Sequence, residues 1–387
     1  MDVRQFDYHL PPELIAQTPI EPRHASRLLI VDRRTGQLSH RTFADIVDLL
    51  HPGDILIAND TRVIPARLYG RKQSGGQVEI LLLKQLDEVQ WEALVGGKRL
   101  RPGVVVEITA GEQRRRGAEE QGSRGAREQG GRGAGEIFPS ASLFVTIKKE
   151  LGESRRLIEF SQPINDLLGE VGHTPLPPYI HTVLEDGERY QTVFSRIDGS
   201  AAAPTAGLHF TPEILLALRD KGVLLDYVTL HIGLDTFKPV TVEQVEEHAI
   251  HREYACLSAT TAHRINQAKL AGGRLVAVGT TAVRTLETAA LRSAGVSGSL
   301  KEASQLDPGL CPWKPVAAID EETDLYIYPG FTFRAVDVML TNFHLPKSTL
   351  LMLVSAFGGP ELIRRAYEAA IAERYRFYSF GDAMLIV

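Results

Sequence analysis

The chain has 387 residues, of which 43% are hydrophobic and 24% charged, the composition of an ordinary globular protein whose length favours two domains. Its formal net charge of −5 argues against a broadly basic nucleic-acid binder. Its two cysteines are too few for a thiolate zinc framework. The N-terminus lacks the apolar core of a signal peptide, and the longest apolar run is far below the ~20 residues of a membrane span, so we expect a cytoplasmic protein without a membrane anchor.

The first part of the chain has the pattern of an α/β fold. Apolar runs at 28–31 and 54–58 predict buried strands, and the apolar spacing of 43–50 predicts a helix between them. Asp60 and Arg62 lie in the polar stretch that directly follows the second strand. Ligands of open α/β folds bind at the carboxyl ends of strands, so both are candidate site residues. The alternative is an Asx-turn that carries a surface arginine.

Residues 62–163 have a different texture, with short β-type runs separated by Gly-rich turns. This pattern predicts a small all-β barrel. Within it, the low-complexity repeat at 111–136 has too few apolar groups to fold, and we expect a disordered loop. The expected fold class is therefore a mixed α/β (α+β) core domain, residues 1–61 and 164–387, with an inserted small β-barrel domain. The insert is net basic and the core net acidic, which is compatible with a phosphate-bearing partner.

The stretch 200–211, SAAAPTAGLHFT, combines small residues, a proline and one histidine. Small side chains let the backbone or a ligand approach closely, and Gly207 can adopt a positive φ at no steric cost. Thr211 and a proline then start a predicted helix. This places His209 beside the positive end of a helix, where polar or anionic ligands bind. The alternative is a tight turn with a solvated histidine.

Two further segments resemble the ends of strands in an α/β sheet. A predicted strand over 223–231 ends in His231, and a buried strand over 274–278 runs into 279–281, Gly-Thr-Thr, at the start of a helix. Strand, Gly-Thr-Thr and helix have the geometry of an anion cradle. The P-loop pattern is absent from this sequence, so plain structure is the alternative. Residues 323–330 predict another strand and turn.

The C-terminal part places three polar residues in one loop. Asn342, His344 and Lys347 precede the apolar run 350–357, which predicts a buried strand or helix. A final helix over 360–375 and a closing strand complete the chain.

Ten separated strings agree with a single family: FDYHLPPELIAQTP, NDTRVIPARL, PLPPYI, RYQTVF, APTAGLHFT, VTLHIGLDTFKPV, HAIHREY, VGTTAVRTLE, TNFHLPKSTLLMLVSAFGG and YRFYSFGDAMLIV. In this order they resemble the S-adenosylmethionine:tRNA ribosyltransferase-isomerases of queuosine biosynthesis. The resemblance implies transfer and isomerisation of the ribosyl group of S-adenosylmethionine onto 7-aminomethyl-7-deazaguanine at the tRNA wobble position. The products are epoxyqueuosine-tRNA, adenine and methionine. S-adenosylmethionine is consumed, and the resemblance implies no metal and no resident cofactor. A monomer is the default expectation.

The implied reaction needs groups that move protons and groups that hold two substrates. A base must remove a proton from the ribose carbon next to the sulfonium, and a proton donor must assist the departure of adenine. Imidazole can do both near neutral pH. We expect the catalytic residues to be His209, His231 and Asp60. We expect substrate binding by Arg62, Thr205, Gly207, Asn342, His344 and Lys347.

One position departs from the family pattern, and two other functions compete. Asp235 stands where the family often has glycine, which questions a need for glycine-like flexibility beside His231. The first rival is a metal-dependent hydrolase in which His248 and His251, at i, i+3 on a helix, join another histidine around zinc. The second is a non-catalytic tRNA-binding module, which predicts a basic surface rich in aromatic residues.

Overall fold

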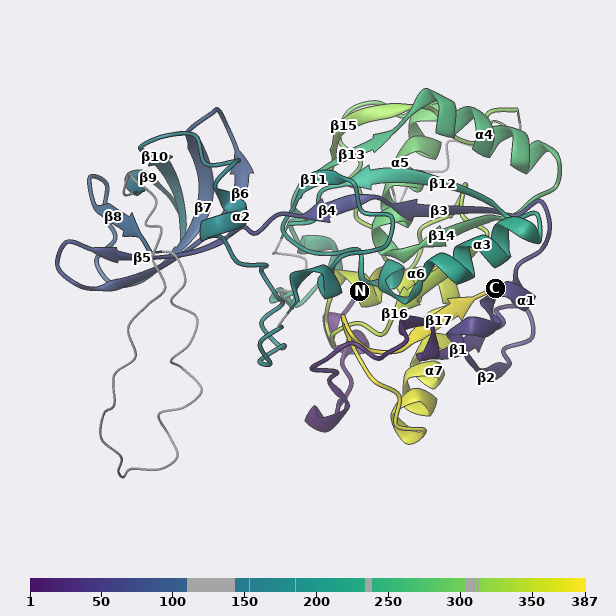
Figure 1. Ribbon diagram of the computed structural model, residues 1–387. Coiled ribbons are helices and arrows are strands. Elements are labelled where there is room, and N and C mark those ends of the chain that lie inside the picture. The colour runs from purple at the N-terminus through teal and green to yellow at the C-terminus, as the bar shows by residue number, and fades with distance from the viewer. Residues whose placement is uncertain are drawn as a thin grey trace. The chain divides into compact units, whose positions relative to one another are not determined.

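The computed structural model describes residues 1–109, 143–152, 154–184, 186–233, 239–301, 303, 311 and 313–387. These residues form two compact units, Met1–Val63 with Leu176–Val387 and Ile64–Pro175 (Figure 1). The repeat at 111–136 and Asp235 lie outside the described residues.

A nine-stranded mixed sheet forms the centre of the larger unit, as far as its residues are described. Its order is β15 (Ile319–Thr323), β13 (Glu253–Leu257), β12 (Leu224–Leu230), β3 (Ile55–Asn59), β14 (Leu275–Val278), β16 (Val338–Asn342), β17 (Ala383–Ile386), β1 (Arg27–Val31) and β2 (Leu38–Thr42). The four strands β12, β3, β14 and β16 are neighbours and run parallel. Their carboxyl ends therefore meet at one edge of the sheet, which is where α/β folds bind ligands.

Helices cover both faces of this sheet. In β3, Ile55 and Ile57 pack into one hydrophobic core, and Leu56 and Ala58 pack into a second one, because successive side chains of a strand point to opposite faces. The first core contains residues of α4 (Ala259–Leu270), α5 (Gly279–Ser293), α6 (Thr349–Gly358) and α7 (Pro360–Ala372). The second contains residues of α1 (Ile46–Leu49) and α3 (Pro212–Asp220). A short parallel pair, β4 (Thr61–Val63) and β11 (Ile197–Ser200), lies beside the main sheet.

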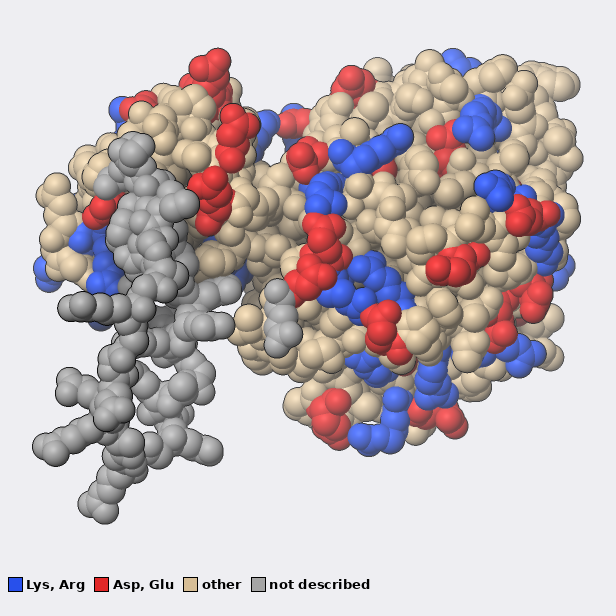
Figure 2. Space-filling view, in the orientation of Figure 1, with Lys and Arg blue, Asp and Glu red and all other residues tan. Residues whose placement is uncertain are grey.

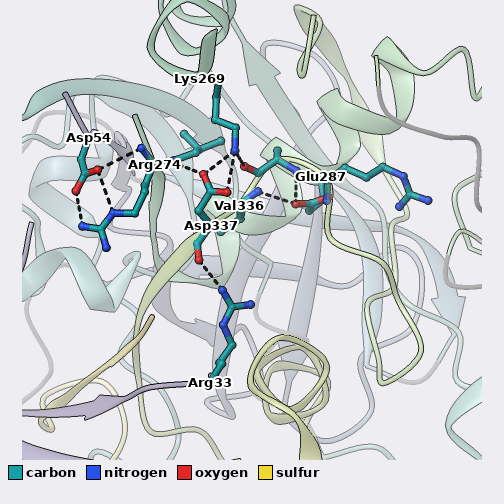
Figure 3. Close-up of polar contacts among 10 residues, drawn as sticks. Arg33, Asp54, Lys269, Arg274, Glu287, Val336 and Asp337 are labelled. Atoms are coloured by element: carbon teal, nitrogen blue, oxygen red, sulfur yellow. Dashed lines mark hydrogen bonds and ion pairs between the residues drawn. The ribbon is translucent and has the colours of Figure 1, made fainter. Parts of the chain in front are cut away.

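Ion pairs fix the amino-terminal edge of the parallel strands, opposite their carboxyl ends (Figure 3). Asp54, before β3, accepts from Arg274 Nε at 3.1 Å, and Arg274 precedes β14. Asp337, before β16, pairs with Lys269 Nζ at 2.6 Å and accepts the N–H of Leu275 at 2.7 Å. Because each carboxylate bonds a residue at the start of the neighbouring strand, the pairs fix the register at this edge.

Glu287 is a fully buried carboxylate in the middle of α5. It accepts the N–H groups of Arg334, Ala335 and Val336 at 2.9, 3.0 and 3.0 Å, and Figure 3 shows its contact with Val336. Burial raises its pKa, and the three donors act in the opposite direction. The side chain thus ties the loop before β16 to the helix that covers the sheet.

The smaller unit is a closed antiparallel barrel. Its strand order is β10 (Arg155–Phe160), β7 (Gln90–Gly96), β6 (Gln77–Gln85), β5 (Arg67–Lys72), β8 (Val105–Ile108) and β9 (Phe144–Gly152). Alternate side chains, such as Trp91, Ala93 and Val95 of β7, are buried inside it. The fold class expected from the sequence, an α/β core with a small all-β barrel, is confirmed.

The segment that follows the barrel strands packs with the barrel unit. It contains the short helix α2 (Leu168–Val171), and His173 exchanges both backbone hydrogen bonds with Arg67 of β5. Our sequence-based domain limit at residue 163 stays a prediction, and the compact unit itself continues to Pro175.

Two local predictions were inaccurate. The strand expected over 323–330 is wrong, since β15 ends at Thr323. Asp324 then accepts the N–H of Leu300 and the hydroxyl of Ser299 at 2.7 Å each, and these bonds hold the chain away from the sheet. The helix expected over 43–50 is a 3₁₀ turn followed by the single turn of α1.

Candidate functional site at the carboxyl edge of the sheet

The parallel strands deliver polar residues from remote parts of the chain to one edge. Asp60 follows β3, His231 follows β12, Gly279 follows β14, and Asn342 ends β16. Since these four strands are adjacent and parallel, the residues that follow them share this edge. That these residues form a single ligand site stays a prediction.

A pocket opens at this edge. It is lined by residues 203–206, 279–281, 341–345 and 378–379, together with Tyr179, Ile232 and Leu350. Its free volume is about 50 Å³, well below the ~300–1,000 Å³ of small-molecule pockets. A nucleoside is therefore larger than the space that this pocket encloses.

Asn342 is the centre of a buried hydrogen-bond network beside the pocket. Its Oδ1 accepts from Thr205 Oγ1 at 3.1 Å, and its Nδ2 donates to the carbonyl of Tyr378 at 3.2 Å and to His209 Nε2 at 3.3 Å. The other ring nitrogen of His209, Nδ1, lies 2.8 Å from Ser26 Oγ. Because Nε2 faces an N–H donor, it acts as acceptor, and the Nδ1 proton is donated to Ser26.

This environment favours the neutral form of His209. Its ring stacks on Phe43, with centroids 5.0 Å apart, and the side chain is 4% exposed. Burial, together with the charges of Arg23 and Arg376, lowers the pKa of His209 to about 3. At neutral pH it is an uncharged imidazole that orients Asn342.

His344 and Lys347 have different surroundings. His344 lines the pocket, and its Nε2 lies 2.7 Å from Thr341 Oγ1. Burial lowers the pKa of His344 to about 3. Lys347 forms an ion pair with Asp7 at 3.0 Å and is outside the pocket lining as described.

Asp60 and His231 form a second polar group at the same edge. Asp60 Oδ2 accepts from Arg196 Nε at 2.7 Å, and its Oδ1 accepts from Thr229 Oγ1 at 2.7 Å. His231 Nδ1 lies 3.0 Å from the hydroxyl of Thr61, the residue next to Asp60. Burial lowers the pKa of His231, and the charge of Asp60 partly opposes that shift. Neither side chain lines the described pocket.

Aromatic stacking and a glycine hold the ring of His231. The imidazole stacks on Tyr254, with centroids 5.4 Å apart. A Cβ at Gly199 would lie 2.8 Å from Cε1 of His231, so only glycine permits this approach. Gly207 has the same role in the 200–211 segment, where a Cβ would lie 2.8 Å from both Phe194 and Thr192.

Arg62 lies on β4 and faces Glu188 and Ser195. It forms an ion pair with Glu188 and donates to Ser195 Oγ at 3.1 Å. On the face of the larger unit that Figure 2 shows, basic and acidic groups are interspersed. A phosphate that binds Arg62 would have to compete with that carboxylate.

The residues expected in the site thus fall into groups. Thr205, Asn342 and His344 line the pocket, and His209 is one hydrogen bond behind it. Asp60 and His231 form the second polar group, and Gly207 supports the loop between Thr205 and His209. Several pocket residues are not among the site residues expected from the sequence, namely Tyr179, Tyr378, Thr280 and Thr281. The Gly-Thr-Thr segment was the signal for the last two.

The geometry gives no support to the metal-dependent rival. His248 and His251 lie in irregular chain between the short turn Val245–Glu247 and β13, and not on a helix. Within the described ranges, no group of three or more His, Cys, Asp or Glu side chains is arranged to hold a metal ion. Among the same residues, no helix is both long and apolar enough to cross a membrane.

Comparison with known proteins gives full-length matches. A family described as "Queuosine biosynthesis protein" matches residues 3–386. The S-adenosylmethionine:tRNA ribosyltransferase-isomerases of Symbiobacterium thermophilum and Heliobacterium modesticaldum are 48% and 47% identical over 391 residues, with 100% of each chain covered. The crystal structure of an S-adenosylmethionine tRNA ribosyltransferase from Thermotoga maritima is 35% identical, with a TM-score of 0.50, and the match covers 99% of this chain and 100% of that one.

Proposed function

Since the chain belongs to the family of queuosine biosynthesis proteins, we propose that it is an S-adenosylmethionine:tRNA ribosyltransferase-isomerase that acts at the carboxyl edge of its large sheet. The observation that carries the proposal is the 45–48% identity to relatives of that name over the whole length of the chain. The match includes both the α/β unit and the barrel.

The reaction places defined demands on the site. The ribosyl group of S-adenosylmethionine is transferred to the amine of 7-aminomethyl-7-deazaguanine at the wobble position of tRNA, and it is isomerised to an epoxide-bearing ring. Adenine leaves from one end of the ribose, and methionine leaves from the other. These products account for the whole of S-adenosylmethionine, so the reaction balances without an oxidant or a reductant. We further propose that no resident metal or cofactor takes part, as the family resemblance implies.

Proton transfer is assigned to His231 and Asp60. His231 is only partly buried, and its lowered pKa leaves the ring neutral near pH 7 and able to accept a proton. Asp60 is held in place by Arg196 and Thr229 at 2.7 Å each. The carboxylate fixed in this way can act as a base or hold ribose hydroxyls.

His209 acts on the pocket through Asn342. With its pKa near 3, His209 is a neutral acceptor that fixes the amide of Asn342, and Asn342 in turn holds Thr205. We propose that these polar groups and His344 bind S-adenosylmethionine, with Gly207 keeping the loop tightly packed. Arg62 and Lys347, each paired with one carboxylate at the surface, are proposed to contact the tRNA. We further propose that the protein works in the cytoplasm as a monomer.

Adenine release tests the proposed function. The protein is incubated with S-adenosylmethionine and a tRNA that carries 7-aminomethyl-7-deazaguanine, and adenine and methionine are quantified by chromatography. We expect equal amounts of both products, and none with a tRNA that carries guanine at the wobble position. Formation of S-adenosylhomocysteine, the product of methyl transfer, would contradict the proposal.

Variants at Asp60 test the proposed role of this residue. Asp60→Asn removes the charge and keeps the shape, so turnover is expected to fall at least ~100-fold, the loss for a general acid–base group. Asp220→Asn, on a side chain that is 69% exposed, is the matched control and should leave turnover unchanged. A near wild-type rate in Asp60→Asn would remove Asp60 from the mechanism without touching the family assignment.

A further inference from the structure

The first turn of α5 faces the pocket without a cap of its own. Gly279 follows β14 with φ +85°, a conformation that glycine adopts without strain. All of α5 is described, and it has neither a side-chain cap at Val278 nor an acidic residue in its first turn. The first N–H groups of a helix have no partner within the helix, and they carry a partial positive charge of ~0.5. Gly279, Thr280 and Thr281 all line the pocket.

Two hydroxyl groups of this turn have no protein partner. Thr280 is only 6% exposed, and among the described residues no hydrogen bond of its side chain is found. Thr281 Oγ1 is buried and also lacks a partner in the described part of the chain. One turn further on, Thr285 Oγ1 donates to the carbonyl of Thr281 at 3.1 Å, whereas first-turn threonines have no helical carbonyl four residues back. A buried hydroxyl without a partner costs stability, which a ligand at this position would recover.

The lining of the pocket indicates which anion would bind there. None of the described residues that line it is Lys, Arg, Asp or Glu, so the helix terminus is the source of positive potential within the lining. RNA phosphates are usually held by Lys and Arg. S-adenosylmethionine has a single anionic group, the carboxylate of its amino-acid end. One carboxylate matches the charge and the donors of one helix N-terminus.

We propose that the first turn of α5, with the hydroxyls of Thr280 and Thr281, binds the carboxylate of S-adenosylmethionine. This inference rests on the proposed function, because it takes S-adenosylmethionine as the substrate. The rings of Tyr179 and Tyr378, with centroids 4.7 Å apart, line the same pocket. The sulfonium of a substrate anchored at the helix lies within this pocket, where aromatic faces attract cations.

A matched pair of ligands and a set of threonine variants test this assignment. Dissociation constants are measured by calorimetry for S-adenosylmethionine and for its decarboxylated analogue, which lacks only the carboxylate. Thr280→Val and Thr281→Val remove the hydroxyls and keep the shape. Each is expected to weaken S-adenosylmethionine binding about tenfold or more, as for a lost hydrogen bond to a charged group, and to leave the analogue unaffected. Thr280→Ser, which keeps the hydroxyl, should restore affinity, and Thr285→Val is the control with unchanged affinities.

Other outcomes would overturn the assignment. An equal loss for both ligands in Thr280→Val, or no loss for either, would show that the carboxylate lies elsewhere. Weaker binding of tRNA with unchanged binding of S-adenosylmethionine would identify a phosphate site instead. Thermal unfolding of each variant shows that it is folded. The proposed function is tested separately by adenine release from the wild-type protein. If the wild-type protein releases adenine but the threonine variants bind both ligands with equal losses, only this inference is refuted.

Discussion

Replacement of His209 by glutamine should reduce the acid sensitivity of the fold. His209 is buried between Phe43 and Asn342, and its pKa is lowered from 6.5 to about 3. Because the unfolded chain then binds a proton more readily than the folded one, this histidine stabilises the fold fully above pH 6.5. The contribution is lost progressively as the pH falls from 6.5 towards 3. Glutamine places an uncharged amide in the same site and cannot titrate.

The magnitude follows from the two pKa values of His209. A pH of 5 is about 1.5 units below 6.5, the pKa of His209 in the unfolded chain, so the unfolded chain is protonated there while the folded one is still neutral. At ~1.4 kcal/mol per unit, protonation of the unfolded chain lowers the free energy of unfolding by about 2 kcal/mol between pH 7.5 and pH 5. His344, with a pKa also lowered to about 3, contributes a similar loss. Together they amount to about 4 kcal/mol, a large part of a typical stability of ~5–15 kcal/mol.

Urea denaturation at pH 7.5 and pH 5, followed by circular dichroism, measures the effect. Between pH 7.5 and pH 5, we expect the wild-type protein to lose about 2 kcal/mol more free energy of unfolding than His209→Gln. This difference does not depend on the stability of the variant at pH 7.5. His263→Gln, at an exposed position of α4, is the control and should retain the wild-type loss. Equal losses in His209→Gln and the wild type would refute the buried, neutral state of His209.

Three further predictions follow from contacts of single residues. His231→Gln should lower adenine release at least ~100-fold, and a rate near wild type would exclude His231 from proton transfer. In Gly199→Ala the new Cβ, 2.8 Å from His231 Cε1, should displace the ring and lower turnover ~100-fold. Gly53 also has a positive φ, but a Cβ there meets no atom within 4 Å, so Gly53→Ala should keep its turnover. Glu287→Gln turns an NH₂ group towards backbone donors, so it should lower the free energy of unfolding by about 1–3 kcal/mol and leave the Michaelis constants unchanged. A urea midpoint equal to that of the wild type would argue against this account.

The strands of the α/β core could be predicted because they are buried on both faces. Runs such as 54–58 and 274–278 are almost wholly apolar, and parallel strands covered by helices require that. The run at 325–328 is just as apolar and fully buried, yet it forms no strand. Burial determines the residue type in both cases, whereas the hydrogen bonds of a strand depend on which segment of the chain lies beside it. Asp324, whose partners Ser299 and Leu300 are remote in sequence, decides the outcome there.

The site was predictable as a set of loops but not as a set of roles. His209, Thr205 and Asn342 each stood out in the sequence, and the structure links them by hydrogen bonds of 3.1 and 3.3 Å. The protonation state of His209 was beyond the sequence, because it depends on Phe43, Ser26 and Arg376 from distant segments. An imidazole that can titrate in a solvated loop becomes a fixed neutral acceptor in this one.

Hydrogen-bond partners separate the positioning residues at this edge from those available to a ligand. The hydroxyls of Ser26, Thr205 and Thr341 are each engaged by another side chain, and their bonds hold the loops in place. The buried hydroxyl of Thr281 has no partner in the described chain, although that of Thr285, one turn on, is bonded within the helix. Because a fold gains nothing from a buried donor left unpaired, unpaired donors that line a pocket are where substrate contacts should first be sought. The Gly-Thr-Thr segment therefore ranks before the histidines as the place to test substrate contacts.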